Sequence, residues 1–158
     1  MHRLARAVAA ALLLMLVAPS NAGASDASDI TAVIGKFNDA ATRADLKAYT
    51  AYCTDDAVIV DRIPPYVFRG PHACEDDWNA VVGWENQNGI VDGGLKISKP
   101  QTLFVSGDRG YAVVPVTVPI THRGKKTTEL ANWTFSLRRL PAGWRITGWA
   151  YAVLKAPQ

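Results

Sequence analysis

GYAVVPVTVPIT, residues 110–121, is the stretch that decides the fold class of this chain. Its apolar residues Val114, Val116, Val118 and Ile120 alternate with their neighbours, which is the period-two pattern of a strand with one buried face. The same alternation continues on both sides, at residues 95–105, 127–139 and 144–154, with short turns between the segments. The sequence therefore predicts four long strands in an antiparallel meander.

Two prolines interrupt this central segment. Pro115 and Pro119 lie four residues apart, and neither has a backbone N–H to donate to a neighbouring strand. Both missing N–H groups would face the same neighbour. We therefore expect either a bulge or a sharply bent, partly unpaired edge at this place.

The N-terminal half has a different pattern. Apolar residues recur at spacings of three and four over residues 29–44, again over 45–53 with Asp45 as the N-cap, and a third time after Gly70-Pro71. Short β-branched or aromatic runs at 57–61 and 66–68 predict a strand pair between the second and third helices. Three helices followed by a meander indicate an α+β fold.

The first 24 residues have the composition of a cleavable secretion signal. Basic Arg3 and Arg6 precede an apolar run from Ala7 to Val17, and small residues end it at Ala22-Gly23-Ala24. A membrane anchor is the alternative, but this run is shorter than the roughly 20 residues of a membrane-spanning helix. We expect cleavage near Ala24, a secreted or periplasmic protein without stable membrane insertion, and a single domain at residues 25–158.

Charge and cysteine content fit this assignment. The whole chain has a formal net charge of +3, and loss of the signal would leave it near neutral, with basic and acidic residues interspersed. Nucleic acid is therefore not an expected partner. Cys53 and Cys74 are the only cysteines, so export predicts a disulfide between them, with two buried free thiols as the alternative.

The order of elements resembles the fold of nuclear transport factor two, in particular its SnoaL-like and ketosteroid isomerase-like branch. The similar segments are AYCTDDAVIVD at residues 51–61, FRGP at 68–71, WTFSLRR at 133–139 and GWRI at 143–146. The resemblance implies a cone-shaped α+β barrel, in which three N-terminal helices pack in a strongly curved, mixed but mostly antiparallel sheet. It also implies an apolar pocket, whereas this fold alone does not determine a function.

Asp61 is the candidate catalytic residue. Alternation places it on the same strand face as Ala57 and Ile59, and it matches the general base of similar ketosteroid isomerases. A carboxylate at the mouth of an apolar pocket has a raised pKa, which suits proton transfer beside a carbonyl. Two other roles remain open: Asp61 could cap the turn before Pro64-Pro65, or pair with Arg62 at the surface.

The isomerase pattern is incomplete elsewhere. Such enzymes hold the enolate oxygen with a tyrosine of the first helix and a protonated carboxyl group of a late strand. Here the first position is Phe37 and the late strand reads Ala131-Asn132-Trp133, so Asn132 or Tyr151 would have to donate instead. We do not expect steroid isomerisation by this route.

Aromatic residues are the candidate ligand-binding groups. A pocket lined by rings with an N–H or O–H at the edge would hold a flat apolar molecule, and a filled core is the alternative. The candidates are Phe37, Tyr52, Trp78, Trp133, Trp149 and Tyr151.

No metal site or cofactor is expected. His72, Glu75 and Asp76 are more simply explained as a solvated first helical turn, and no phosphate-binding glycine loop or zinc spacing occurs in the sequence. The first functional hypothesis is an exported domain that binds a small hydrophobic or aromatic molecule. The alternatives are an isomerase, cyclase or dehydratase that uses Asp61 as its base, and a homodimeric protein-interaction module.

Overall fold

The computed structural model describes residues 22–155. The three helices are α1 at Ala22–Thr42, the short α2 at Leu46–Thr50 and α3 at Ala73–Asn88, and the strands β1 and β2 lie between α2 and α3 in the sequence. The predicted secretion signal lies outside the described residues up to residue 21. Helix α1 starts earlier than the expected Asp29 and passes through the expected cleavage position at Ala24.

Local sequence explains where the helices begin and end. Asp45 caps α2, since its side chain accepts a hydrogen bond from the Ala48 N–H at 3.0 Å. Helix α3 ends at Gly89, whose φ of 61° is the left-handed conformation that glycine adopts without strain. Glu75 and Asp76 lie exposed in its first turn, as expected for acids near the positive end of a helix dipole.

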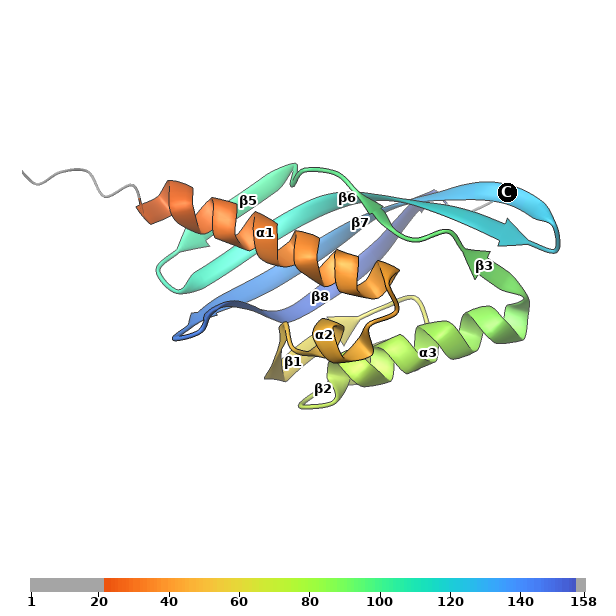
Figure 1. The fold of residues 1–158 in the computed structure, drawn as a ribbon, viewed down its shortest axis with the longest axis horizontal. Helices are drawn as coiled ribbons and strands as arrows, with labels where there is room; N and C mark the ends of the chain where they lie inside the picture. Colours follow the sequence, from red (N-terminus) through yellow and green to blue (C-terminus); the bar gives the residue numbers. More distant parts are fainter. Residues whose placement is uncertain (1–21, 156–158) are drawn as a thin grey trace, which may run out of the picture.

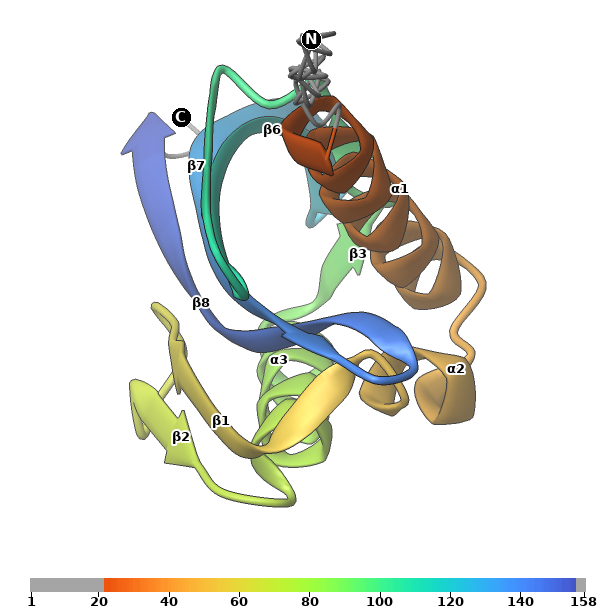
Figure 2. The same ribbon diagram turned by 90° about the vertical axis from the view of Figure 1, so that its left-hand side faces the viewer.

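The sheet is mixed and mostly antiparallel, as the sequence predicts. The strand order is β2-β1-β8-β7-β6-β3, β4 and β5 also pair with β6, and the β1–β8 pair is parallel. Figure 2 shows how strongly β6, β7 and β8 curl. The strands are β1 (Cys53–Val60), β2 (Val67–Arg69), β3 (Ile90–Asp92), β4 (Lys96–Ile97), β5 (Thr102–Ser106), β6 (Arg109–His122), β7 (Lys125–Leu140) and β8 (Gly143–Lys155).

The prolines of β6 break one edge of the sheet into short strands. The carbonyls of Pro115 and Pro119 accept hydrogen bonds from Ser98 and Gly93 on the β3–β5 side, so their missing N–H groups face that side too. The expected partly unpaired edge is confirmed. The pairing on this side also shifts by one residue between Asp92↔Ile120 and Lys96↔Thr117, while β6 pairs with β7 without a register shift. The single strand expected at residues 95–105 is wrong: β4 and β5 replace it.

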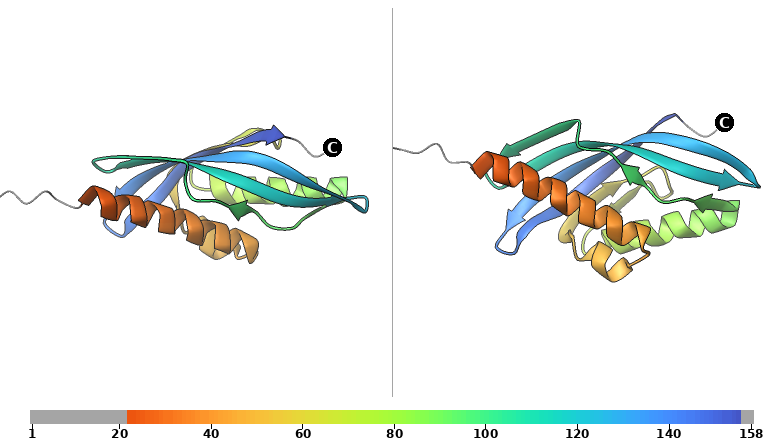
Figure 3. Two further views of the ribbon diagram at one scale, coloured as in Figure 1. Left: turned by 90° about the horizontal axis from the view of Figure 1, so that it is seen from above. Right: turned by 45° about the horizontal axis from the view of Figure 1, so that its top comes forward.

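Helix α1 lies along one face of the curved sheet (Figures 1 and 3). Ile30, Ile34 and Phe37 project from it into the core and are fully buried. The approach is close at Gly110 of β6, where a Cβ atom would lie 2.6 Å from the Ile30 Cδ1. At the start of the helix, Asp26 forms a salt bridge with Arg139 of β7.

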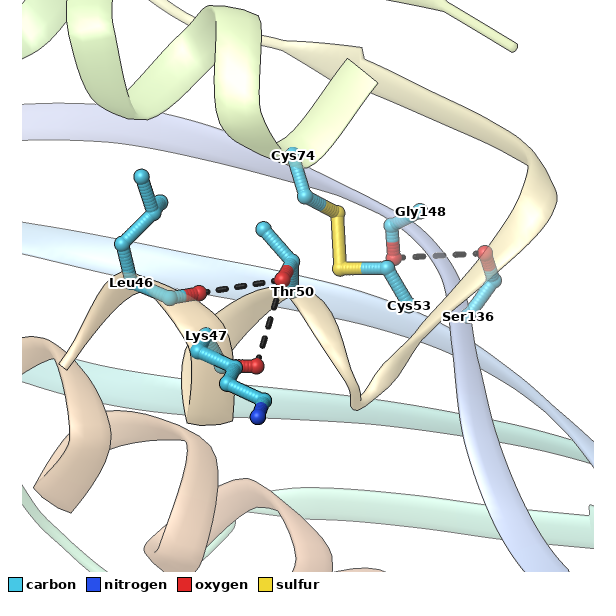
Figure 4. Close-up of a disulfide and its surroundings, with 7 residues drawn as sticks. All are labelled: Leu46, Lys47, Thr50, Cys53, Cys74, Ser136 and Gly148. Atoms are coloured by element: carbon cyan, nitrogen blue, oxygen red, sulfur yellow. Dashed lines mark hydrogen bonds between the residues drawn. A yellow bond between two sulfur atoms is a disulfide. The ribbon is translucent and has the colours of Figure 1, made fainter. Parts of the chain in front are cut away.

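A disulfide joins Cys53 and Cys74, at the start of β1 and in the first turn of α3, with Cα atoms 6.6 Å apart (Figure 4). It fixes the first turn of α3 beside the parallel β1–β8 pair. No helix among residues 22–155 is both long and apolar enough to span a membrane.

Candidate functional site

A cavity of about 310 Å³ opens between α3 and the concave side of the sheet. The C-terminal end of α1 and Tyr49 of α2 close one side, and Val118 and Ile120 of β6 lie on its wall. Asp61, directly after β1, Trp133 of β7 and Trp149 of β8 also line it. The helices and the curl of the sheet therefore create the concave, mainly apolar kind of site that binds small molecules.

Four of the six aromatic residues predicted to bind a ligand lie on this wall. Trp78 comes from α3, Trp133 from β7, and Trp149 and Tyr151 from β8. A bulge at Thr147 brings Ile146 and Trp149 to the same inner side of β8. Strand alternation past the bulge then places Tyr151 beside Trp149.

Phe37 and Tyr52 do not line the cavity. Phe37 is fully buried behind its wall, 4.2 Å from the Tyr49 ring and 5.2 Å from the Trp149 ring, measured between centroids. Tyr52 packs edge-on against Phe37. Helix α1 turns Phe37 into the core, and Tyr52, between α2 and β1, packs against that ring, so both support the wall. Tyr49, which was not among the predicted residues, lines the cavity.

Asp61 lies on the cavity wall, and it also caps the turn. Alternation along β1 buries Ala57 and Ile59 and carries Asp61 to the same side. One carboxylate oxygen accepts a hydrogen bond from the Ile63 N–H at 3.0 Å. Burial raises the pKa of Asp61, and the hydrogen bond from Ile63 opposes that effect.

A second carboxyl group, Asp77, was not singled out by the sequence analysis. It lies on α3 three residues after Cys74 and four before Val81, within the inward stripe of the helix. Only 4% of it is exposed, and its Oδ1 has no hydrogen-bond partner among the described residues. Burial, aided by the charge of Asp61, raises the pKa of Asp77 to about 8. An acid inside an apolar helical stripe was the available signal.

A third carboxyl group corrects the prediction that the late strand offers none. Glu129 of β7 alternates with Ala131 and Trp133 and is 2% exposed on the cavity wall. It accepts a hydrogen bond from the Tyr151 hydroxyl at 2.9 Å, and Arg62 Nη2 lies 3.5 Å from the same oxygen. Burial, together with Glu129, raises the pKa of Tyr151. Arg62 therefore pairs with Glu129 in the structure.

The disulfide lies apart from this cavity, beside a smaller polar depression near Thr54 and Asp55. Figure 4 shows Thr50 donating hydrogen bonds to the carbonyls of Leu46 and Lys47 next to it. Within the part of the chain that the structure describes, no group of three or more His, Cys, Asp or Glu side chains is placed to hold a metal ion.

Comparison with known proteins agrees with this architecture. The family model described as the SnoaL-like domain matches residues 30–154. No curated protein matches the sequence. Solved structures with a similar fold include a nuclear transport factor two-like protein with a cystatin-like fold from Novosphingobium aromaticivorans, with a TM-score of 0.68 and 19% identity, covering 84% of each chain.

Two further structures have names that refer to enzymes. A ketosteroid isomerase-like protein from Erwinia carotovora atroseptica has a TM-score of 0.63 and 20% identity, covering 83% of this chain and 98% of its own. A type 2 hexachlorocyclohexane dehydrochlorinase has a TM-score of 0.63 and 14% identity, covering 85% of this chain and 90% of its own. At these identities the likeness concerns the fold.

Proposed function

Because the chain belongs to the SnoaL-like domain family, we propose that it binds a small organic molecule in the cavity between α3 and the sheet. The observation that carries the proposal is the composition of the wall, which combines tryptophan and tyrosine rings with carboxyl groups, among them Asp61 and Asp77. The rings provide apolar contact area, and the carboxyls fix the orientation of a polar group.

The energetics of the wall support this proposal. Asp77 Oδ1 and Trp133 Nε1 are buried without a hydrogen-bond partner in residues 22–155, and burying a polar group in that state costs on the order of 1–3 kcal/mol. A core built only for stability would place apolar side chains here. A ligand with a polar group and an apolar body would offset this cost at the cavity wall.

Tryptophan fluorescence and thermal shift with a panel of aromatic and alicyclic compounds test the proposal. We expect saturable quenching in the wild type and its loss in Val81→Trp, because Val81 lines the cavity and a larger side chain would fill it. Val91→Trp is the matched control, since Val91 is 65% exposed on β3 and does not line the cavity. Unchanged binding by Val81→Trp would contradict the proposal.

A second candidate function is catalysis of proton transfer, with Asp61 as the base. The specific observation in its favour is the carboxyl pair: Asp77, with a pKa of about 8, stays protonated near neutral pH beside Asp61. Asp61 would accept a proton from a carbon next to a ligand carbonyl, and the Asp77 O–H would donate a hydrogen bond to the carbonyl oxygen. The similarity to structures named for an isomerase-like protein and a dehydrochlorinase is consistent with this chemistry.

Isotope exchange distinguishes catalysis from binding alone. Each ketone that binds would be incubated with the protein in deuterated water, and its mass would report exchange at the carbon next to the carbonyl. Catalysis predicts exchange that Asp61→Asn abolishes while binding persists. Equal exchange by wild type and Asp61→Asn, or no exchange of any bound ketone, would leave binding as the function.

A further inference from the structure

The charges on the cavity wall are unbalanced. Its described lining residues include the carboxyl groups of Asp61, Asp77 and Glu129, and Arg62 is the one basic residue among them. Charges interact more strongly in a site of low dielectric constant than in water, so ionised carboxyls here produce a negative potential. The cavity therefore presents more carboxyl groups than basic groups to a ligand.

Arg62 is engaged by the protein itself. Its Nη2 lies 3.5 Å from Glu129 Oε1, and its guanidinium carbon lies 5.1 Å from the Trp84 ring centroid and 5.9 Å from that of Tyr151. The charge of Glu129 is therefore compensated within the wall. Among residues 22–155, no lysine or arginine forms a salt bridge with Asp61 or Asp77.

Asp77 points to a ligand independently of this charge count. Only 4% of its surface is exposed, and its Oδ1 lacks a hydrogen-bond partner within the described part of the chain. A buried carboxylate is strongly destabilised unless a cation or several hydrogen-bond donors meet it. An ammonium group supplies both the charge and the N–H donors.

The aromatic rings that line the cavity beside the carboxyl groups pack at steep interplanar angles to one another. Tyr49 meets Trp78 with centroids 4.9 Å apart and an interplanar angle of 61°. Trp133 meets Trp149 at 6.0 Å and 88°. Ring faces attract cations, and tryptophan does so most strongly, so these walls suit the charged end of a ligand as well as its apolar body.

We infer that the ligand is a small organic cation, an amine whose ammonium group binds Asp61 and Asp77 and whose apolar body packs against the tryptophans. This inference rests on the proposed binding function and names the ligand class. A neutral ligand of the same shape would leave Asp61 without a countercharge and Asp77 in its protonated form. The groups that face the site are Asp61, Asp77, Glu85, Glu129, Arg62, Tyr49 and Tyr151.

Amine binding should be coupled to proton release. Asp77 is mostly protonated at neutral pH, since its pKa is about 8, and an ammonium group beside it favours the ionised form. Affinity should therefore increase from pH 5 to pH 8, as the free protein loses this proton.

The probes for the test are 1-naphthylmethylamine and 1-naphthylmethanol, which share one ring system and differ in the charged group. Isothermal titration at pH 7, in two buffers that differ in protonation enthalpy and carry no primary amine, measures affinity and the number of protons released. We expect the amine to bind at least roughly tenfold more tightly than the alcohol and to release protons. Asp77→Asn and Asp61→Asn should each reduce this preference, whereas Asp76→Asn, an exposed acid next to Asp77, should keep it.

The outcomes separate this inference from the proposed function. If the alcohol binds as tightly as the amine, or if the preference survives in both Asp61→Asn and Asp77→Asn, the cation inference is wrong while small-molecule binding stands. If neither these probes nor the wider panel bind at millimolar concentration, both fail. Circular dichroism of each variant shows whether its fold is intact, and Asp61→Asn decides the matter if Asp77→Asn does not fold.

Discussion

Asp77 is the residue whose titration should be visible in the stability of the whole protein. Its pKa is raised from 3.8 to about 8 by burial and by Asp61, so between these values the folded state holds a proton that the unfolded state has lost. The free energy of unfolding must therefore fall as pH rises through this range. The sign is opposite to that of a salt-bridged carboxylate.

Asp77→Asn should remove this dependence, since asparagine is neutral throughout. Chemical denaturation measures this effect. From pH 5 to pH 8, the free energy of unfolding of the wild type should fall by on the order of a few kcal/mol relative to that of the variant. Asp76→Asn is the control, because Asp76 is exposed one residue away. Parallel pH curves for wild type and Asp77→Asn would show that Asp77 is ionised in the fold.

Gly148 is the glycine that the β8 bulge requires. A Cβ atom at this position would overlap the carbonyl oxygen of Val58, across the parallel β1–β8 pair. Gly148→Ala should therefore lower the free energy of unfolding by on the order of 3 kcal/mol. Gly83→Ala, in the interior of α3 with nothing within 4 Å of its Cβ position, should raise it by roughly 0.5–1 kcal/mol. Urea unfolding of the wild type and both variants measures these opposite changes in the free energy of unfolding.

The position of a side chain could be predicted from the sequence where the local pattern determined it, but not where tertiary packing did. Strand alternation carried Asp61 to the side on which the cavity lies, and it would have done the same for Glu129. Phe37 was predicted to line the pocket but lies behind its wall, because the depth to which α1 packs is a tertiary property. The place of Asp77 in the apolar stripe of α3 indicated burial, but its missing hydrogen-bond partner depends on how α3 packs against the sheet.

At the scale of elements, strand and helix types followed from periodicity, and the β6 prolines correctly predicted an interrupted edge. The division into β3, β4 and β5 was not predicted, because it depends on which side of β6 lacks its donors. The bulges in β8 and β1 were also missed. Each results from pairing between distant strands, which alternation along one strand does not reveal.

The disulfide links two elements that form the site. Cys74 precedes Asp77 and Trp78 in the first turns of α3, and Cys53 begins β1, which ends beside Asp61. Closing a loop with a sequence separation of 21 contributes about 3 kcal/mol in the chain-entropy model. The free energy of unfolding of the double variant Cys53→Ala/Cys74→Ala should be lower by this amount, and the variant should also bind ligand more weakly.

Urea unfolding and fluorescence titration of the double variant test this prediction, with oxidised and reduced wild type alongside. Reduced wild type keeps both side chains and should be destabilised similarly, so it separates the crosslink from the effect of truncation. An unchanged midpoint on reduction would mean that β1 and α3 hold together without the bridge.

At the scale of the whole molecule, the fold predicts that export and cleavage leave the domain intact. We propose cleavage near Ala24 from the composition of residues 1–24, and the disulfide is consistent with an oxidising compartment. The contacts that hold α1 to the sheet come after this position: Asp26 pairs with Arg139, and Ile30 and Ile34 are buried. Removing the residues before Ser25 therefore shortens α1 and leaves these contacts in place.

Intact mass measurement in a bacterium with a periplasm tests this proposal in one step. The full chain should yield a periplasmic protein with the mass of residues 25–158 less two hydrogens, which reports cleavage and the disulfide together. Leu13→Arg, which interrupts the apolar run of the signal, should leave an uncleaved cytoplasmic chain with both thiols reduced. A full-length wild-type chain retained in the membrane fraction would support the anchor instead. The mature protein must also bind ligand as the full chain does, since every cavity residue lies after residue 40.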